Sequence, residues 1–215
     1  MIYFAAMQII KNLRAVIWDM GGVLLRTIDW TPRSMLAKRF GMTDHELMDL
    51  VFHSDTAVKA EIGQLSYAEY WNGVMKKLGV DEKALSWFMG AFFQGDQFDW
   101  HLMKIIRYLR VRYKTGLLSN ALPGTRVTLG KKYDFLDDFD DAIFSYEVGL
   151  RKPDERIYQL AARRLGIAPE EAVFIDDMPE NVDGALKAGM NGLVFINESQ
   201  VISEFGYLTG IENHH

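Results

Sequence analysis

The sequence predicts an α/β fold, with a Rossmann-like parallel sheet as core and an inserted α-helical cap. Three observations predict it. Four short apolar runs are spread along the chain, each of them leads into polar residues, and residues 28–97 show helical rather than strand periodicity. Short apolar runs bounded by turn residues are typical of buried parallel strands, and their alternation with helices indicates an α/β sheet.

The first apolar run is Val16–Trp18, which ends in Asp19 and, after Met20, in the pair Gly21-Gly22. We predict a buried strand whose last residue is pushed into a tight turn. An aspartate held there can serve as a nucleophile or bind a metal ion. Taken alone, an Asp-x-Gly-Gly sequence is more typical of an ordinary turn.

Residues 28–97 follow, with signals for four amphipathic helices. Thr43 and Ser66 each begin a capping box with a glutamate three residues later, and glycines end the first and third helices. The expected helices are residues 34–40, a helix from 43 that includes Leu47, Leu50 and Val51, residues 66–78, and a helix over 84–92 capped by Asp81.

Amphipathic helices of this kind bury their apolar faces against one another. We therefore expect the aromatic residues of this stretch to form the core of a small bundle rather than a ligand surface. These residues are Tyr67, Tyr70, Trp71, Trp87, Phe88, Phe92 and Phe93. Trp30, His53 and Asp55 are the candidates for lining a substrate pocket. The alternative for each is an ordinary role at the surface or in the core.

The other three apolar runs lead into the remaining polar clusters. Gly116–Leu118 precedes Ser119-Asn120, and residues 142–145 precede the segment 150–154, in which Pro153 suits the first turn of a helix. Residues 172–175 lead into Asp176-Asp177 and a helix over 181–189. Each cluster has an ordinary explanation as a turn, a solvated charge or a helix cap. Because ligands bind at the carboxyl ends of parallel strands, all four together predict one site.

The chain resembles the haloacid dehalogenase-like hydrolase superfamily, whose four motifs match Asp19, Ser119, Lys152 and Asp176-Asp177 in order. Within the superfamily, residues 18–24, 118–120 and 149–154 are similar to small sugar-phosphate phosphatases, such as α-glucose-1-phosphatase and the phosphatase domain of soluble epoxide hydrolase. The resemblance implies that residues 28–97 are a mobile cap closing over the active site.

The resemblance also implies a Mg²⁺-dependent phosphatase that acts on a small phosphorylated metabolite through an aspartyl phosphate. Asp19 is the expected nucleophile, and Lys152 and Ser119 the expected groups that neutralise and hold the phosphoryl oxygens. Substrate binding is expected at Gly21, Gly22 and Asn120. The expected Mg²⁺ ligands are Asp19, Asp177 and the Gly21 carbonyl, with Asp176 as a second ligand or an outer-shell partner.

Gly21 is a departure from the family pattern, in which most phosphatases have an aspartate as general acid and base two residues after the nucleophile. Asp29 and Glu147 are the candidate substitutes. The departure leaves a second function open, a phosphate-binding or regulatory protein with little turnover. A third, a dehalogenase, is disfavoured because Asp176-Asp177 without a cation would repel an attacking carboxylate.

Length and composition agree with one core and an inserted lobe: the chain has 215 residues, of which 49% are hydrophobic. We expect a core of residues 12–27 and 98–202, a cap of residues 28–97, and terminal segments 1–11 and 203–215. The net charge of −5 argues against nucleic acid as a partner. No apolar run has membrane-spanning length. The sequence does not predict an oligomeric state.

Cysteine is absent, which excludes disulfides and fits a cytoplasmic location. The apolar start, Met1–Met7, is too short for a signal-peptide core, so we expect a disordered lead or a packing segment, with Met7 as an alternative start. We interpret the terminal pair His214-His215 as a remnant of a purification tag, and a metal site is the less favoured alternative.

Overall fold

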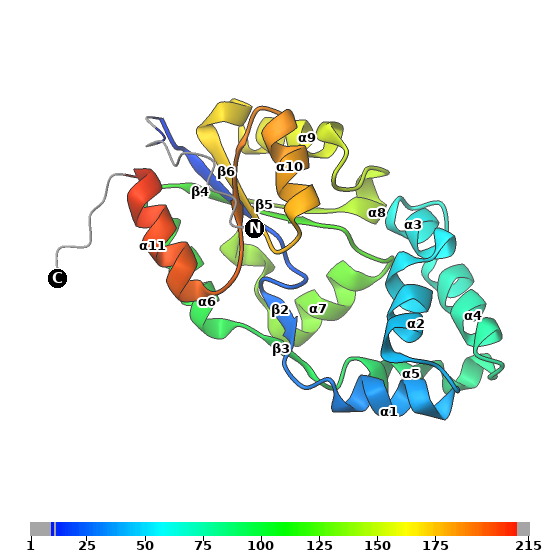
Figure 1. The fold of residues 1–215 in the computed structure, drawn as a ribbon. Helices are drawn as coiled ribbons and strands as arrows, with labels where there is room; N and C mark the ends of the chain where they lie inside the picture. Colours follow the sequence, from blue (N-terminus) through cyan, green and yellow to red (C-terminus); the bar gives the residue numbers. More distant parts are fainter. Residues whose placement is uncertain (1–9, 11, 210–215) are drawn as a thin grey trace.

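The structure is a computed structural model that describes residue 10 and residues 12–209. Its centre is a five-stranded parallel sheet with the order β5-β4-β1-β6-β7, which confirms the predicted α/β class (Figure 1). The strands of this sheet are β1 (Ala15–Trp18), β4 (Lys114–Ser119), β5 (Asp141–Phe144), β6 (Ala172–Asp176) and β7 (Asn191–Val194).

Strand β1 is the middle strand, and all four of its residues are completely buried. It pairs with β4 on one side and β6 on the other, with Trp18 opposite both Leu117 and Ile175. A strand covered on both faces has no polar face to show to water, which explains its continuous apolar sequence. Because the chain turns to opposite sides of β1, the carboxyl end of β1 is the topological switch point of the sheet.

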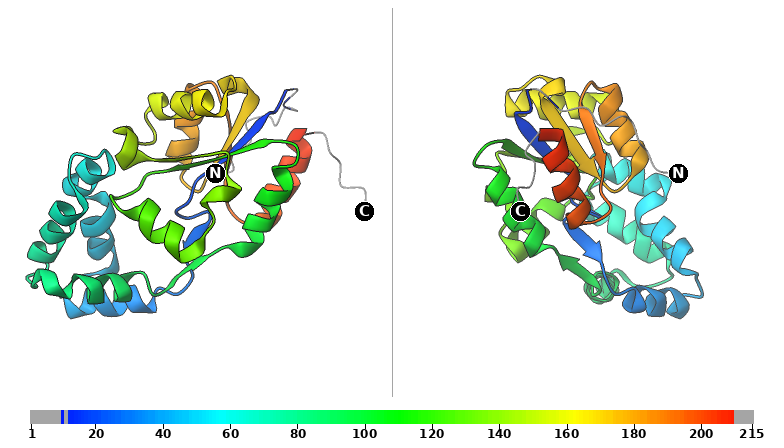
Figure 2. Two further views of the ribbon diagram at one scale, coloured as in Figure 1. Left: turned by 180° about the vertical axis from the view of Figure 1, so that it is seen from behind. Right: turned by 60° about the vertical axis from the view of Figure 1, so that its left-hand side comes forward.

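Helices cover both faces of the sheet (Figure 2). One face packs against helices α9 and α10, and the other against α6 and α11. The helices of the core are α6 (Trp100–Leu109), α7 (Thr125–Tyr133), α8 (Ser145–Val148), α9 (Glu155–Leu165), α10 (Pro179–Lys187) and α11 (Glu198–Thr209), with 3-10 turns at Leu136–Asp138 and Pro169–Glu171.

Helix α9 begins later than the sequence predicted. Asp154 is its N-cap, and the Asp154 carboxylate accepts a hydrogen bond from the backbone N–H of Arg156 at 3.0 Å. The prediction that Pro153 occupies the first turn was therefore wrong. A side-chain acceptor that satisfies a free N–H sets the start of this helix more strongly than the fixed φ of proline.

The remaining helices form a cluster of their own beyond the carboxyl edge of the sheet (Figure 1). They lie in sequence between two short strands, β2 (Leu25–Thr27) and β3 (Asp96–Phe98), which pair antiparallel. The helical cluster consists of α1 (Thr31–Arg39), α2 (Asp44–Met48), a π-helical turn (Asp49–His53), α3 (Asp55–Glu61), α4 (Tyr67–Lys77), a 3-10 turn (Glu82–Ala84) and α5 (Leu85–Phe92).

Local sequence signals predicted the starts of two of these helices correctly. Both capping boxes are formed, with Thr43 and Glu46 at α2 and with Ser66 and Glu69 at α4. Asp81 caps a 3-10 turn that precedes α5, rather than α5 itself. The sequence analysis missed α3, a seven-residue helix whose N-cap, Ser54, accepts a hydrogen bond from the Ala57 N–H.

The expected aromatic core of the helical cluster is present. Tyr70, Trp71, Phe88 and Phe92 are fully buried and in ring contact with one another. Tyr67 and Trp87 differ from the expectation, because 40% and 45% of their surfaces are exposed. Helical periodicity predicts the apolar face of a helix, but it does not predict which residues of that face lie at the edge of the bundle.

Within the described residues, no helix combines the length and the apolar character that a membrane crossing requires. The segments Met1–Met7 and His214-His215, on which predictions were made, lie outside the described residues.

The two connections between the helical cluster and the core meet at Gly95. Its carbonyl oxygen accepts hydrogen bonds from the backbone N–H groups of Ile28 (3.0 Å) and Asp29 (3.3 Å). A Cβ on Gly95 would lie 1.8 Å from the Asp29 carbonyl oxygen, whereas a Cβ on the helical Gly90 would meet no atom within 4 Å.

Gly95→Ala should therefore destabilise the protein by about 1–3 kcal/mol, because the two connecting segments must separate to admit a methyl group. Gly90→Ala is the matched control and should stabilise α5 by up to about 1 kcal/mol, since alanine favours helices. Urea unfolding of both variants measures the difference. Equal stability of the two variants would contradict the close contact at Gly95.

Candidate active site

Asp19 lies directly after β1, at the switch point of the sheet. Its backbone N–H donates to the carbonyl oxygen of Ile175 at 2.8 Å, which continues the pairing of β1 with β6 by one residue. Only 6% of Asp19 is exposed. The strand pairing therefore holds this carboxylate in the crevice where ligands bind in α/β sheets.

Lys152 contacts residues at the ends of three strands, which are Asp19 after β1, Asp176 in β6 and Asn120 after β4. Its Nζ lies 2.6 Å from Asp19 Oδ1 and 2.6 Å from Asp176 Oδ2, and the lysine is 1% exposed. Burial lowers the pKa of Lys152, but the two carboxylates outweigh burial and leave the pKa above its usual value. The ammonium group is therefore charged and held between two acids.

Asp176 is fully buried, and both of its carboxylate oxygens are engaged. Oδ1 accepts from the Met178 N–H at 2.8 Å, and the side-chain amide of Asn181 donates to both oxygens at 3.1 Å. The backbone carbonyl of Asn181 in turn accepts from the Tyr158 hydroxyl at 2.6 Å. The sequence analysis gave Asn181 no role, although an amide one helical turn after an acidic pair is the signal that could have found it.

Asp177 packs against Gly22, which has a φ of +82°. A Cβ on Gly22 would lie 2.2 Å from Asp177 Oδ2. The Gly22 N–H donates to the Leu25 carbonyl at 2.9 Å, so this donor is used within the turn. The predicted binding of substrate at Gly22 stays a prediction. Glycine is needed here both for the left-handed backbone and to make room for the second carboxylate.

Asp19, Asp176 and Asp177 form the acidic group of the site, with one ligand atom from each residue within 4.8 Å of the others. Burial raises the pKa of Asp19 to about 7, with Lys152 opposing the shift and the Asp176 charge adding to it. Burial, followed by the Asp176 charge, raises the pKa of Asp177 to about 6. Three carboxylates face one ammonium, so the donor set and its excess negative charge fit a divalent cation.

Asn120 holds the Lys152 segment, and its predicted contact with substrate stays a prediction. Its Oδ1 accepts from the Lys152 N–H at 2.8 Å, and its Nδ2 donates to the Lys152 carbonyl at 3.0 Å. The neighbouring Ser119 is 1% exposed at the end of β4. Ser145, which sequence reasoning missed, fixes the same loop by accepting from the Ala121 N–H at 2.9 Å.

Gly21 is exposed, and a Cβ at this position would meet no heavy atom within 4 Å. Its φ lies outside the left-handed region, in contrast to that of its neighbour Gly22. Most phosphatases of the family that this chain resembles have an aspartate at this position. Here the position has room for a side chain, and its backbone conformation is not restricted to glycine.

Neither candidate substitute for the missing acid is a free carboxyl group. Asp29 accepts from the Thr31 N–H at 2.9 Å, and its hydrogen bonds to Thr31 lower its pKa. Glu147 forms a two-point pair with Arg126 at 2.7 and 2.8 Å. Burial opposes the effect of Arg126 on Glu147, yet the pKa of Glu147 is lowered.

Two of the three residues considered for the substrate pocket have other contacts in the helical cluster, and the third is exposed. The ring of Trp30 lies against the Arg33 guanidinium, and His53 Nδ1 lies 2.9 Å from Asp49 Oδ1. Asp55 is in the exposed first turn of α3. Arg33 itself is buried and paired with Asp96 at 2.9 Å, which ties α1 to β3.

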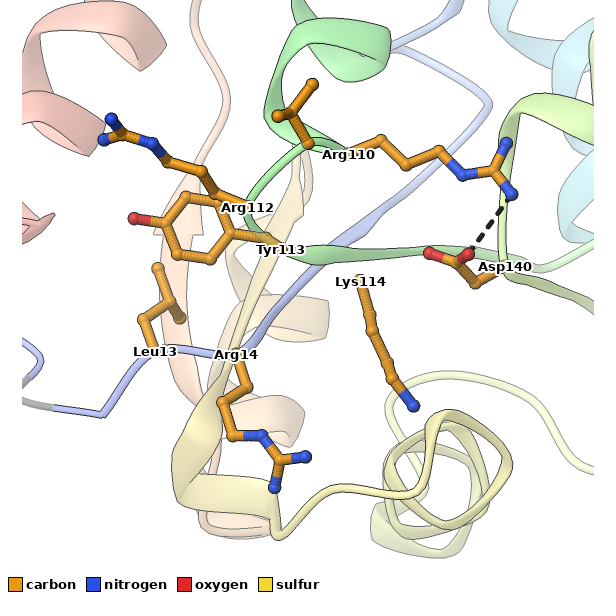
Figure 3. A pocket seen from close by; sticks show the side chains of 8 residues that line it. Leu13, Arg14, Arg110, Arg112, Tyr113, Lys114 and Asp140 are labelled. Atoms are coloured by element: carbon orange, nitrogen blue, oxygen red, sulfur yellow. Dashed lines mark hydrogen bonds and ion pairs between the residues drawn. The ribbon is translucent and has the colours of Figure 1, made fainter.

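A pocket of 340 Å³ lies at the opposite edge of the sheet, where β1 and β4 begin (Figure 3). Arg14, Arg110, Arg112 and Lys114 line it, but their side chains point in different directions. Arg14 pairs with Glu171, Arg110 with Asp140, and Lys114 Nζ donates to the Leu165 carbonyl. The cations therefore do not converge on one bound anion.

The fold and the site define an α/β protein with a buried, metal-competent acidic group at the switch point of its sheet. The haloacid dehalogenase-like hydrolase family matches residues 13–189, and the chain belongs to this family. D-ribitol-5-phosphate phosphatase of Bacteroides thetaiotaomicron is 26% identical over 184 residues, covering 80% of this chain and 85% of that protein.

Two further proteins are similar to this chain. Drimenol cyclase drtB of Aspergillus calidoustus is 27% identical over 195 residues, or 88% of this chain and 35% of that protein. The chain thus spans about a third of that relative and less of two other curated relatives. A HAD family enzyme of Bacteroides thetaiotaomicron, solved as a magnesium complex, shares the fold with a TM-score of 0.75 and 23% identity, covering 89% of this chain and 99% of that chain.

Lys152→Met should destabilise the protein by about 3–5 kcal/mol, because Asp19 and Asp176 lose their buried counter-ion. Adding Asp176→Asn to this variant should recover part of the loss, since one unpaired charge is then gone. Chemical denaturation without added metal measures both effects.

The matched control is Arg107→Met, which breaks the half-exposed pair between Arg107 and Asp138. An exposed pair of this kind contributes about 0–1 kcal/mol. If Lys152→Met costs no more than Arg107→Met, the buried pairing does not contribute to stability as described.

Proposed function

We propose that this protein is a Mg²⁺-dependent phosphatase that hydrolyses a small phosphate monoester, a sugar phosphate or a related metabolite, through an aspartyl phosphate on Asp19. The observation that supports this most is the placement of the Asp19 carboxylate, which is buried at the switch point, paired with Lys152 and close to Asp177. A carboxylate in such a position can act as a covalent nucleophile in phosphoryl transfer.

In the first step an oxygen of Asp19 forms a bond to phosphorus, and the bond from phosphorus to the leaving-group oxygen breaks. The leaving-group oxygen takes a proton from solvent, because Gly21 has no side chain to donate one. In the second step water attacks phosphorus and gives a proton to solvent, and the bond between phosphorus and the Asp19 oxygen breaks. Inorganic phosphate is released and the carboxylate is restored. Lys152 neutralises the phosphoryl oxygens throughout, and the Ser119 hydroxyl is the proposed hydrogen-bond donor to them.

Asp19, Asp177 and the Gly21 carbonyl are the proposed ligands of Mg²⁺. When bound, the ion offsets the negative charge of the carboxylates and the phosphate. Asp176 takes the outer position of its two expected roles, because Lys152, Asn181 and Met178 already occupy its oxygens. The Bacteroides enzyme with the same fold was solved as a magnesium complex, which supports Mg²⁺ as the ion.

The family relatives support a phosphate ester as substrate, since one of them is a D-ribitol-5-phosphate phosphatase. We further propose that residues 28–97 act as a mobile cap over a core of residues 12–27 and 98–202. Closure of such a cap excludes water and large phosphoproteins, which favours small metabolites.

The missing acid at Gly21 favours one alternative, a phosphate-binding member of the family with little turnover. Both functions share the metal and the phosphate cradle, and they differ only in the rate of hydrolysis. The variants below separate them.

Asp19→Asn should lower the turnover of p-nitrophenyl phosphate with Mg²⁺ by at least about 10³-fold, because an amide cannot form the aspartyl phosphate. The control is Asp137→Asn, which changes an exposed aspartate in the 3-10 turn before β5, at the opposite edge of the sheet, and should keep wild-type activity. Steady-state kinetics with thermal unfolding of both variants makes the test. Full activity of a folded Asp19→Asn variant would contradict the mechanism through an aspartyl phosphate.

Gly21→Asp should raise kcat, most for alkyl esters with poor leaving groups, because it supplies the missing acid and base in a position with free space. General acid–base help is typically worth about 10² to 10⁴ in rate, so a gain of about tenfold or more on an alkyl phosphate is expected.

Gly21→Asn is the matched control, of equal size but without a transferable proton, and should show no gain. If a folded Gly21→Asp variant gains on no ester, another residue supplies the proton. If the wild type and Gly21→Asp are both inert on a broad panel of esters, the binding-protein alternative is correct.

A further inference from the structure

A partly buried ion pair joins the helical cluster to the core beside the proposed active site. Glu61, the last residue of α3, is 7% exposed, and its Oε2 accepts from Arg151 Nε at 2.8 Å. Arg151 directly precedes Lys152 in the chain. The contact is close, because a Cβ on Gly63, two residues after Glu61, would lie 2.4 Å from the Tyr146 carbonyl oxygen of the core.

The position of Lys152 does not depend on this pair. Asn120 holds both backbone polar groups of Lys152, and the carboxylates of Asp19 and Asp176 hold its ammonium. The geometry of the lysine thus has its own support, and Glu61 and Arg151 are free for another task.

Both partners of the pair have unused hydrogen-bonding capacity. A carboxylate has about four acceptor positions, and Glu61 accepts one hydrogen bond among the described residues. Arg151 uses only its Nε–H in the same set of bonds and leaves its terminal N–H groups unbonded. The second carboxylate oxygen of Glu61 is not among the fully buried atoms without a partner in the described residues, so water or a ligand can reach it.

The pair lies beside the proposed phosphate position, because Arg151 directly precedes Lys152 and contacts Glu61 of the helical cluster. Burial raises the pKa of Glu61, and the charges of Arg151, Lys152 and His53 oppose the rise. A phosphate ester bound by Lys152 can therefore extend toward the boundary between the helical cluster and the core.

We propose that Glu61 and Arg151 together determine substrate specificity by binding hydroxyl groups of the leaving group. The leaving group is then uncharged and carries several hydroxyl groups, so the substrate is a phosphate ester of a sugar or an alditol. Glu61 accepts a hydrogen bond from a hydroxyl, and the terminal N–H groups of Arg151 donate to hydroxyl oxygens. This inference rests on the proposed phosphatase function and refines its substrate class.

The same pair disfavours leaving groups that contain a carboxylate. A second carboxylate beside Glu61 brings two like charges together in a buried setting, while the Arg151 charge is already balanced by Glu61. Sites that bind a substrate hydroxyl through a buried polar group discriminate strongly against analogues that cannot satisfy it.

The test compares glycerol 3-phosphate with 3-phosphoglycerate, which differ only by a CH₂OH group in place of a carboxylate. The wild type should prefer glycerol 3-phosphate in kcat/KM. Glu61→Gln should reduce that preference by about tenfold or more, the usual weight of one hydrogen bond to a charged group. Activity on p-nitrophenyl phosphate, which has neither group, should change by less than about twofold.

Glu171→Gln is the control, since it alters a glutamate–arginine pair at the opposite edge of the sheet and should leave the preference unchanged. If Glu61→Gln lowers all three activities in parallel, the pair is only a structural link between the helical cluster and the core, and the inference is overturned. If the wild type hydrolyses none of the three esters, the proposed function fails instead.

Binding to the Asp19→Asn variant, measured by calorimetry with and without Glu61→Gln, gives a second readout that needs no turnover. The inference predicts tighter binding of glycerol 3-phosphate than of 3-phosphoglycerate, and loss of this difference with Glu61→Gln. An unchanged difference would overturn it.

Discussion

The structure depends on the burial of Lys152 between Asp19 and Asp176. Three charged groups lie out of water at the ends of β1 and β6, and each is satisfied only because the others are in place. Removing one partner of a buried ion group costs far more than the group contributes when complete. The surrounding hydrogen bonds follow from this constraint: Asn120 fixes the lysine segment, and Asn181 with the Met178 N–H fixes Asp176.

The same constraint accounts for the chemistry that we propose. Asp177 is the carboxylate without such support, and it lies against Gly22, where a side chain would displace it. Together with Asp19 it gives the site the excess negative charge that a cation offsets. The pairing also extends outward through the chain, since Arg151, next to Lys152, contacts Glu61 of the helical cluster. The segment that holds Lys152 thus also contacts the helical cluster that we propose as a cap.

Sequence patterns predicted what neighbouring residues determine. The four apolar runs of the sheet, the polar residues after each run and the two capping boxes depend on residues a few positions apart. The parallel sheet then brings Asp19, Lys152 and Asp176 together. The sequence did not predict what long-range contacts determine. Strands β2 and β3 have three residues each and are stabilised by pairing across the inserted helices, and the use of Asn120 on Lys152 and the Glu61–Arg151 pair arise only in the folded chain.

Detection of a covalent intermediate tests the central claim most directly. The protein is mixed with p-nitrophenyl phosphate and Mg²⁺, quenched with acid within the first turnover and digested, and the peptide that contains Asp19 is examined by mass spectrometry. The account predicts one phosphoryl group on Asp19 that hydroxylamine removes, and none in the Asp19→Asn variant. Release of p-nitrophenol with no phosphoryl group on Asp19, or with the group on another residue, would contradict it.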